Sequence, residues 1–210
     1  VSSSAPLPRL IASRQWLTPE NPVQITPEPR GSLSSLVAKA AVFPQDGISA
    51  LTQQLRVRAV GINFRDVLNV LGMYPGDPGA PGSDCAGVIV GGASAQHSDS
   101  LPAGTAVLGL APGCLGTQVA CDARLVAPKP AALGFIEAST LPTAFITVAV
   151  AFGQASHAWG SSSAGSMCAL VHAASGGVGQ AGVQLVQGMG GWCHGTAGSV
   201  RKRAVVRCML

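Results

Sequence analysis

The pattern of apolar and polar residues predicts a series of short strands in the first two thirds of the chain. Residues 55–60, Leu-Arg-Val-Arg-Ala-Val, alternate as a half-buried strand does. Further short apolar stretches are bounded by glycine and proline, and we expect strands over residues 86–90, 106–110, 117–121 and 124–127. Short strands separated by such turn signals are typical of a small antiparallel barrel.

A helical pattern interrupts these strands. Its apolar residues recur at positions i, i+3, i+4 and i+7, which are Phe64, Val67, Leu68 and Leu71. This spacing predicts a short amphipathic helix that ends at Gly72, and we expect Asp66 to brace it. A loop rich in glycine and proline follows over residues 73–79.

The last third of the chain changes to a strand, a turn of small residues and a helix. Residues 168–171, Cys-Ala-Leu-Val, predict a buried strand, and we expect His172 after them to be a core histidine. The helix that follows has one face of apolar or small residues, at Val178, Gly182, Leu185 and Met189.

The turn between that strand and that helix predicts dinucleotide binding. Small residues let backbone N–H groups at the helix N-terminus approach a pyrophosphate. The three small positions of G-x-G-x-x-G fall on Ala174, Gly176 and Gly179, and the strand–turn–helix context supports the motif. The residues expected to contact the nucleotide are Ala174, Ser175, Gly176, Gly177, Val178 and Gly179. The alternative is a tight packing turn that binds no ligand.

The residues after a second expected strand, 192–196, favour NADPH over NADH. An NAD site carries an Asp or Glu about 20 residues beyond the glycines, and this chain has no acid near that point. Arg201, Lys202 and Arg203 instead occupy the first turn of the next helix, where Ser199 is the expected N-cap. Cations there oppose the helix dipole, and a 2′-phosphate held by Ser199, Lys202 and Arg203 would offset that conflict. A solvated basic helix face is the alternative.

Composition narrows the class of protein. Charged residues make up 10% of the chain and hydrophobic residues 47%, against a usual charged share of about 25%. So small a share of charged residues suggests that much of the surface is covered, as in a piece of a larger assembly. The balance of 13 basic and 9 acidic residues gives no reason to expect nucleic acid as a partner.

Six cysteines without a C-x-x-C pair indicate reduced thiols. Without a signal peptide or an apolar run near the ~20 residues of a membrane span, we expect no membrane association and a cytoplasmic location.

Several stretches together carry a family resemblance. The loop V-H-A-A-S-G-G-V-G at 171–179 resembles that of medium-chain dehydrogenases/reductases of the quinone-reductase type. Residues 57–79 are similar, nearly residue for residue, to the enoylreductase domains of modular type I polyketide synthases. The resemblance continues in order at residues 82–88, 109–113 and 141–145, and it covers about residues 31–210.

The resemblance implies an α/β fold with an added β domain. Residues 1–30 would be a linker, 31–145 a GroES-like barrel, and 146–210 the first part of a doubly wound Rossmann domain. The 64 residues from Thr147 onward suffice for two strands and about two helices, whereas six strands need on the order of 150 residues. We therefore expect an incomplete Rossmann domain, and we expect residues 1–210 alone not to catalyse.

The activity implied by the resemblance is NADPH-dependent reduction of an α,β-unsaturated acyl thioester on an acyl carrier protein, beside neighbouring polyketide synthase domains. Tyr74 matches a tyrosine that the family places beside the substrate double bond, and a phenol is a credible proton donor to an enolate. A packing role is the alternative for Tyr74. Asn63 and Thr147 match positions that line the nicotinamide.

The resemblance also bears on metals and on other activities. The zinc-dependent branch carries a cysteine where this chain has Asn63 and a histidine where it has Ser83, so we expect no metal. A free-standing quinone reductase of the same fold is a second interpretation. A non-catalytic remnant that at most binds nucleotide is a third.

Overall fold

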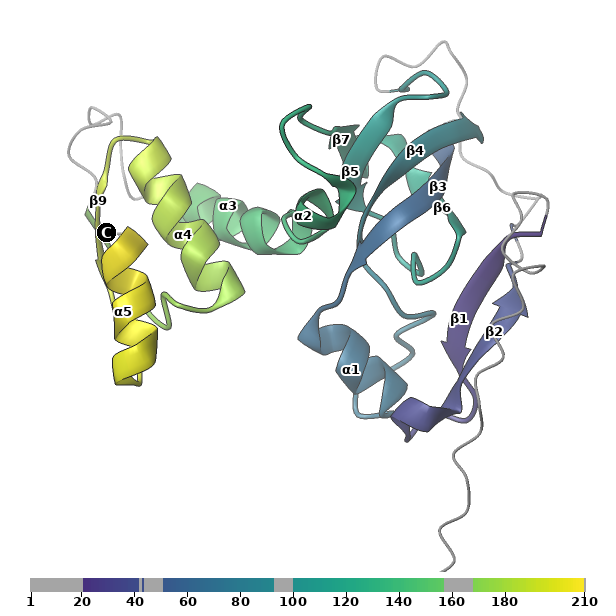
Figure 1. Cartoon of the computed structure of the whole chain (residues 1–210), viewed down its shortest axis with the longest axis horizontal. Helices are drawn as coiled ribbons and strands as arrows, with labels where there is room; N and C mark the ends of the chain where they lie inside the picture. The colour runs from purple at the N-terminus through teal and green to yellow at the C-terminus, as the bar shows by residue number, and fades with distance from the viewer. Residues whose placement is uncertain (1–20, 42, 44–50, 93–99, 157–167, 210) are drawn as a thin grey trace, which may run out of the picture.

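The computed structural model describes residues 21–41, 43, 51–92, 100–156 and 168–209. Figure 1 shows an antiparallel part and a smaller part with a parallel strand pair, joined by two helices. The strands of the antiparallel part are β1 (Val23–Pro27), β2 (Leu36–Ala40), β3 (Thr52–Gly61), β4 (Asp84–Gly92), β5 (Ala106–Leu110), β6 (Gln118–Asp122) and β7 (Val126–Pro128). A single helical turn, η2 (Leu33–Ser35), precedes β2, and another, η3 (Ala123–Leu125), precedes β7.

The antiparallel part is built on a five-stranded sheet with the order β6-β3-β4-β5-β7. Its strands agree with those predicted from the pattern of apolar and polar residues, with ends that differ by a few residues. The β1–β2 hairpin is joined to the segment before β6, because Ile25 N donates to Leu115 O at 2.7 Å and Thr117 N donates to Val23 O at 2.8 Å. Residues 23–27 were expected to belong to a linker, and that expectation was wrong for this strand: its apolar residues pair with β2 despite the prolines around it.

The core of the antiparallel part is formed by small and medium side chains from several strands. They are Leu55, Cys85, Ile89, Val107, Ala111, Cys114, Val119, Cys121 and Val126. All six cysteines of the chain are unpaired, as expected. Burial raises the pKa of Cys121 to about 12. A hydrogen bond with the Cys85 thiol, together with burial, raises the pKa of Cys114 far above the usual value for a thiol. The thiols of Cys114 and Cys121 therefore stay protonated at neutral pH in the folded protein.

Helix α1 (Phe64–Val70) forms where the spacing predicted it and ends before Gly72, which has a φ of 66°. Its buried face was predicted only in part, since Val67, Leu68 and Leu71 are half-buried. Phe64 is 74% exposed, whereas Asp66 and Asn69 are buried. Their side chains are turned inward because they bond to the backbone of the loop that follows the helix. Asp66 braces the helix as expected, since its carboxylate accepts hydrogen bonds from Asn63 N at 2.8 Å and from Gly82 N at 2.8 Å.

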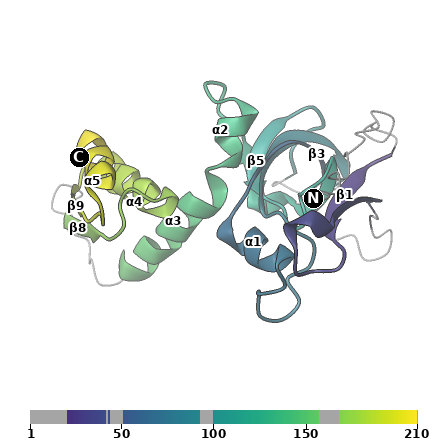
Figure 2. The same cartoon turned by 60° about the horizontal axis from the view of Figure 1, so that its bottom comes forward.

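Helices α2 (Phe135–Ser139) and α3 (Pro142–Ser156) connect the two parts of the structure. Figure 2 shows α3 extending from the antiparallel part to the helices of the smaller part. Pro142 occupies the first helical position, where its missing N–H costs nothing. Further along α3, Val148 is buried and lies against Gly182 of the next helix. No helix in the described ranges is long and apolar enough to cross a bilayer.

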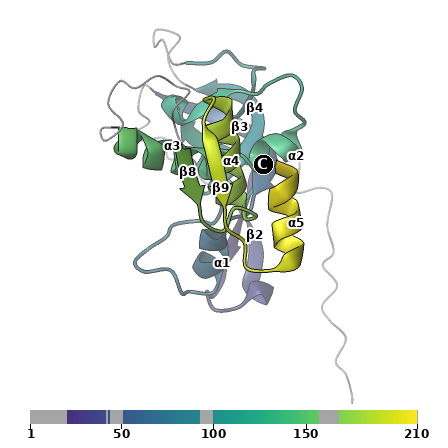
Figure 3. The same ribbon diagram turned by 90° about the vertical axis from the view of Figure 1, so that its left-hand side faces the viewer.

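The smaller part consists of β8 (Cys168–Val171), α4 (Gly177–Gly188), β9 (Trp192–Gly195) and α5 (Val200–Met209). These are the two strands and two helices that the length of the segment predicted. The strands pair in parallel, from Cys168 beside Trp192 to Val171 beside Gly195, and Figure 3 shows them in front of α4. A small core forms around Ala174, Val183 and Val206.

Two predictions about exposure in this smaller part were wrong. The strand expected to be buried has alternately exposed residues, with Leu170 at 61% exposure, because the helices cover only one face of the pair. The predicted apolar face of α4 is also displaced, since Val178 is 48% exposed and Met189 39%. The buried face contains Gly179, Ala181, Gly182, Val183 and Val186.

Candidate nucleotide and substrate site

The turn between β8 and α4 has the backbone of an anion-binding helix start. Gly176 is the N-cap of α4, with φ −80° and ψ 165°. The first helical bond runs from Gln180 N to Gly176 O at 2.8 Å, so the amides of the residues between them have no acceptor within the helix. Gln180 also donates from its side chain to Ser175 O at 2.9 Å, which holds the turn against the helix.

The glycines of this turn serve two different purposes. A Cβ on Gly179 would lie 2.4 Å from Ala173 O, so this residue must be glycine for the turn to pack on the helix. A Cβ on Gly177 would meet no atom within 4 Å, and one on Gly176 would meet only Ala173 O at 3.4 Å. The exposed side of the turn is therefore bare backbone with free space beside it. Glycine inside a helix costs stability, and no packing contact explains it at Gly177.

The carboxyl ends of β8 and β9 meet beside this turn. Ala174, which is fully buried, donates from its amide to Thr196 O at 2.9 Å, and Ala173 N donates to Thr196 Oγ1 at 3.2 Å. The expectation of a core histidine was wrong. His172 is exposed just beyond β8, and its Nδ1 lies 3.2 Å from Thr196 Oγ1. Open α/β sheets bind ligands in the crevice outside the carboxyl ends of their strands.

The basic residues after β9 begin helix α5. Ser199 is the N-cap, as predicted, because Ser199 Oγ accepts from Lys202 N at 3.3 Å and Ser199 O accepts from Arg203 N at 2.8 Å. Arg201, Lys202 and Arg203 are all exposed. Among the described residues, no carboxylate pairs with these three cations. Their charge is available to an anion from solution.

A buried carboxylate joins the antiparallel part to α3. Asp84, only 2% exposed, accepts from Asn63 Nδ2 at 3.2 Å and from Thr143 N at 3.1 Å, and the Thr143 hydroxyl donates to it as well. A negative charge at the first turn of α3 is favourable. Thr147 follows Thr143 by one turn and is exposed. Asp84 thus links Asn63 to the first turn of α3, one turn before Thr147.

The loop after α1 folds back and carries Tyr74 with it. Tyr74 N donates to Leu68 O at 3.2 Å, and the half-buried ring lies 5.2 Å from Cζ of Arg65, a cation–π distance. The ring is therefore held against helix α1, beside Arg65. Its role in catalysis stays a prediction.

Sequence reasoning did not single out Asp84, Thr143, Arg65 or Arg30. An acid at the start of a buried strand, and a Pro-Thr pair at a helix start, were the available signals for the first two. In the part of the chain that the structure describes, no three His, Cys, Asp or Glu side chains gather into a cluster that could hold a metal ion. Asn63, at a would-be ligand position, is bonded to Asp84.

A five-stranded antiparallel sheet, followed by a parallel βαβ unit with a glycine turn, defines the class: the fold is that of a medium-chain dehydrogenase/reductase. Among solved structures, the CurK enoyl reductase superimposes with a TM-score of 0.73 at 30% identity, over 90% of this chain and 57% of that one. A quinone oxidoreductase from Thermus thermophilus superimposes with a TM-score of 0.62 at 26% identity, over 86% of this chain and 55% of that one.

Sequence relatives narrow the class to a family. The pikromycin polyketide synthase component PikAII of Streptomyces venezuelae is 37% identical over 83% of this chain and 4% of its own length. The spectinabilin polyketide synthase system protein NorB of Streptomyces orinoci is 36% identical over 87% of this chain and 8% of its own. No family model matches the chain. By sequence, the chain is related to modular polyketide synthase components, and its fold is shared with enoyl reductases of the medium-chain dehydrogenase/reductase superfamily.

Proposed function

We propose that the chain is part of an NADPH-dependent enoyl reductase that reduces an α,β-unsaturated acyl thioester on an acyl carrier protein, within a polyketide synthase. The observation that carries the proposal is the bare backbone at Gly176 and Gly177, at the carboxyl ends of two parallel strands. The polyketide synthase relatives and the enoyl reductase neighbours support this reaction class. The chain spans less than a tenth of those relatives, so carrier and neighbouring domains are part of the proposal.

The residues of the turn fit a dinucleotide. The amides of Gly177, Val178 and Gly179 would hold the pyrophosphate, since the helix leaves them without acceptors. Ser199, Lys202 and Arg203 would hold the 2′-phosphate of NADPH. A quinone oxidoreductase of this fold was solved in complex with NADPH, which supports the same choice of cofactor.

When bound, NADPH supplies the hydride that adds to the β-carbon of the enoyl thioester. The chain contributes orientation and a proton. The hydroxyl of Tyr74 would donate that proton to the α-carbon of the resulting enolate, and the Arg65 guanidinium over its ring would help to orient it. Asn63 and Thr147 would line the nicotinamide from the two elements that Asp84 joins.

The test uses the full-length gene product with crotonyl thioester and NADPH in deuterated water. We expect one deuterium at the α-carbon with a single configuration, and we expect Tyr74→Phe to slow reduction or scramble that configuration while NADPH binding is kept. An unchanged rate and configuration in Tyr74→Phe would return this residue to a packing role. Absence of thioester reduction by the wild type would refute the proposal.

A free-standing quinone reductase is the second candidate, favoured by the fold shared with the Thermus thermophilus enzyme. It predicts turnover of ortho- or para-quinones without a carrier protein. The same preparation, assayed with quinones and with crotonyl thioester on an acyl carrier protein, separates the two. A large excess of quinone turnover over thioester reduction would favour this candidate.

A further inference from the structure

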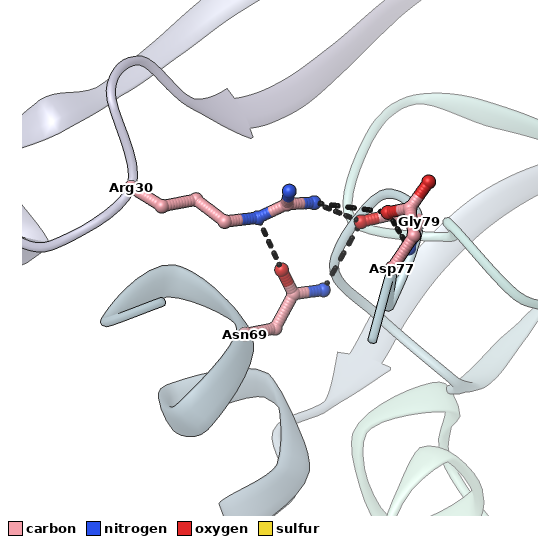
Figure 4. Close-up of polar contacts among 4 residues, drawn as sticks. All are labelled: Arg30, Asn69, Asp77 and Gly79. Carbon is pink, nitrogen blue, oxygen red and sulfur yellow. Dashed lines mark hydrogen bonds and ion pairs between the residues drawn. The ribbon is translucent and has the colours of Figure 1, made fainter. Parts of the chain in front are cut away.

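Arg30 reaches from the connection between β1 and β2 into the loop that carries Tyr74. Figure 4 shows its guanidinium between α1 and the far side of that loop. Arg30 Nε donates to Asn69 Oδ1 at 3.1 Å, and Arg30 Nη2 donates to Gly79 O at 2.8 Å. The backbone beside it is also fixed, because Gly31 N donates to Val70 O at 2.9 Å. We call Arg30, Asn69 and Gly79 the Arg30 clamp.

Asn69 is the buried member of the Arg30 clamp, with 2% exposure. Its Oδ1 accepts from Arg30, and its Nδ2 donates to Gly79 O at 3.2 Å, so one loop carbonyl accepts from both side chains. A buried amide of this kind is costly to leave without partners. Loss of Arg30 would remove the donor that Asn69 Oδ1 has among the described residues and would free one side of the loop carbonyl.

The loop has no other anchor at its centre among the described residues. Its start is tied through Tyr74 N to Leu68 O, and its end through Gly82 N to Asp66. Between them, Pro75, Gly76 and Asp77 are exposed, and a Cβ on Gly76 would meet nothing within 4 Å. Asp77 is 86% exposed, and its 3.8 Å ion pair with Arg30 adds little.

We propose that Arg30 is a positioning residue, which holds the middle of the glycine-rich loop so that Tyr74 keeps one orientation beside Arg65. The inference rests on the proposed function only for what Tyr74 does in the reaction. The contact itself links residues 39 positions apart in the sequence. This contact lies outside the turn between β8 and α4, and it is separate from the hydrogen bonds that Asp84 makes with Asn63 and Thr143.

The first test exploits the single tyrosine of the chain. Biosynthetic 3-fluorotyrosine places one ¹⁹F nucleus in residues 1–210, at Tyr74. We expect one narrow ¹⁹F line in the wild type, and in Arg30→Met a line broadened or moved toward the shift of the urea-unfolded chain. Hydrogen exchange in residues 73–82 should be about tenfold faster, since the lost bonds are charge-assisted but partly exposed. Arg124→Met, which removes an exposed arginine paired with Asp122, is the control and should change neither.

Arg30→Lys separates positioning from folding. A lysine ammonium can still donate to Gly79 O, so this variant should restore the narrow line in part, and circular dichroism should report a native fold for all variants. A folded Arg30→Met protein with the wild-type line and wild-type exchange would overturn the inference.

A kinetic arm in the full-length gene product keeps this inference apart from the proposed function. We expect Arg30→Met to lower kcat for thioester reduction without changing the NADPH dissociation constant, and to add nothing to Tyr74→Phe in the double variant. If Tyr74→Phe reacts like the wild type, the role proposed for Tyr74 fails. The ¹⁹F line then still decides whether Arg30 holds the loop.

Discussion

Gly177 is the residue at which protein stability and nucleotide affinity should change in opposite directions. In Gly177→Ala the added methyl would meet no atom within 4 Å, and the backbone is not left-handed. Alanine inside a helix is about 0.5–1 kcal/mol more stable than glycine, so the free energy of unfolding should rise by up to that amount. The same methyl occupies the space from which a pyrophosphate would approach the amides of the first turn.

The expected loss of affinity follows from the bond that the methyl prevents. A hydrogen bond to a charged group contributes about 1.5–3 kcal/mol, and each 1.4 kcal/mol is tenfold in a dissociation constant. Gly177→Ala should therefore weaken NADPH binding by roughly tenfold to a hundredfold. Urea denaturation gives the stability, and titration calorimetry gives the dissociation constant.

Two other glycines of α4 provide the controls. Gly188→Ala lies at the far end of the helix, also with nothing within 4 Å, and should raise stability with an unchanged NADPH dissociation constant. Gly179→Ala should lower both stability and affinity, because its methyl would lie 2.4 Å from Ala173 O, and such overpacking costs about 1–3 kcal/mol or more. If Gly177→Ala is stabilised and still binds NADPH like the wild type, the turn is a packing turn and the reasoning fails.

Three further predictions concern charge. Changing Lys202 and Arg203 together to alanine should raise the NADPH dissociation constant by about tenfold or more and spare NADH, and a wild type that binds both equally would contradict this. Hydrogen bonds from Arg124 lower the pKa of Asp122 from 3.8 to about 2, so their stabilisation should be present above 3.8 and lost as the pH falls toward 2. In Asp122→Asn, the urea midpoint should change less with pH between 3.8 and 2 than it does in the wild type. Burial raises the pKa of Cys121 from 9.0 to about 12, so stability should fall as the pH rises from 9.0 toward 12, and less steeply in Cys121→Ala.

Local sequence patterns predicted where the strands and helices lie better than they predicted which of their residues are buried. Alternation located β3, and short apolar stretches bounded by glycine and proline located β4 to β7. These patterns failed for β1, whose residues Val23–Pro27 lie among prolines and pair with a strand about ten residues further on. The buried faces of the helices were also not fully predicted. The inward face of α1 contains Asp66 and Asn69 beside Val70, because these two polar side chains bond to loop backbone, which no apolar spacing can reveal.

In the candidate site, features that depend on neighbouring residues could be predicted, and those that depend on residues distant in the sequence could not. The glycine turn and the Ser199 cap depend on neighbouring residues, so their spacing was enough to predict them. Arg30 and Asp84 act across 39 and 59 positions of sequence, and only the folded chain brings their partners to them. Tyr74 was found by resemblance, whereas the Arg65 guanidinium beside it became visible only when the loop was seen to fold back.

The buried carboxylate of Asp84 has a consequence for exchanging segments between synthases. It holds Asn63 and Thr143 at once, so these three positions form one unit contributed by separate stretches of the chain. A chimera whose crossover lies before Thr143 would combine an Asp84 from one parent with a helix start from another. A crossover within α3, beyond Thr143, keeps the unit from a single parent. Grafted C-terminal parts should therefore be accepted more readily when the junction lies inside that helix than when it lies in the short connection between α2 and α3.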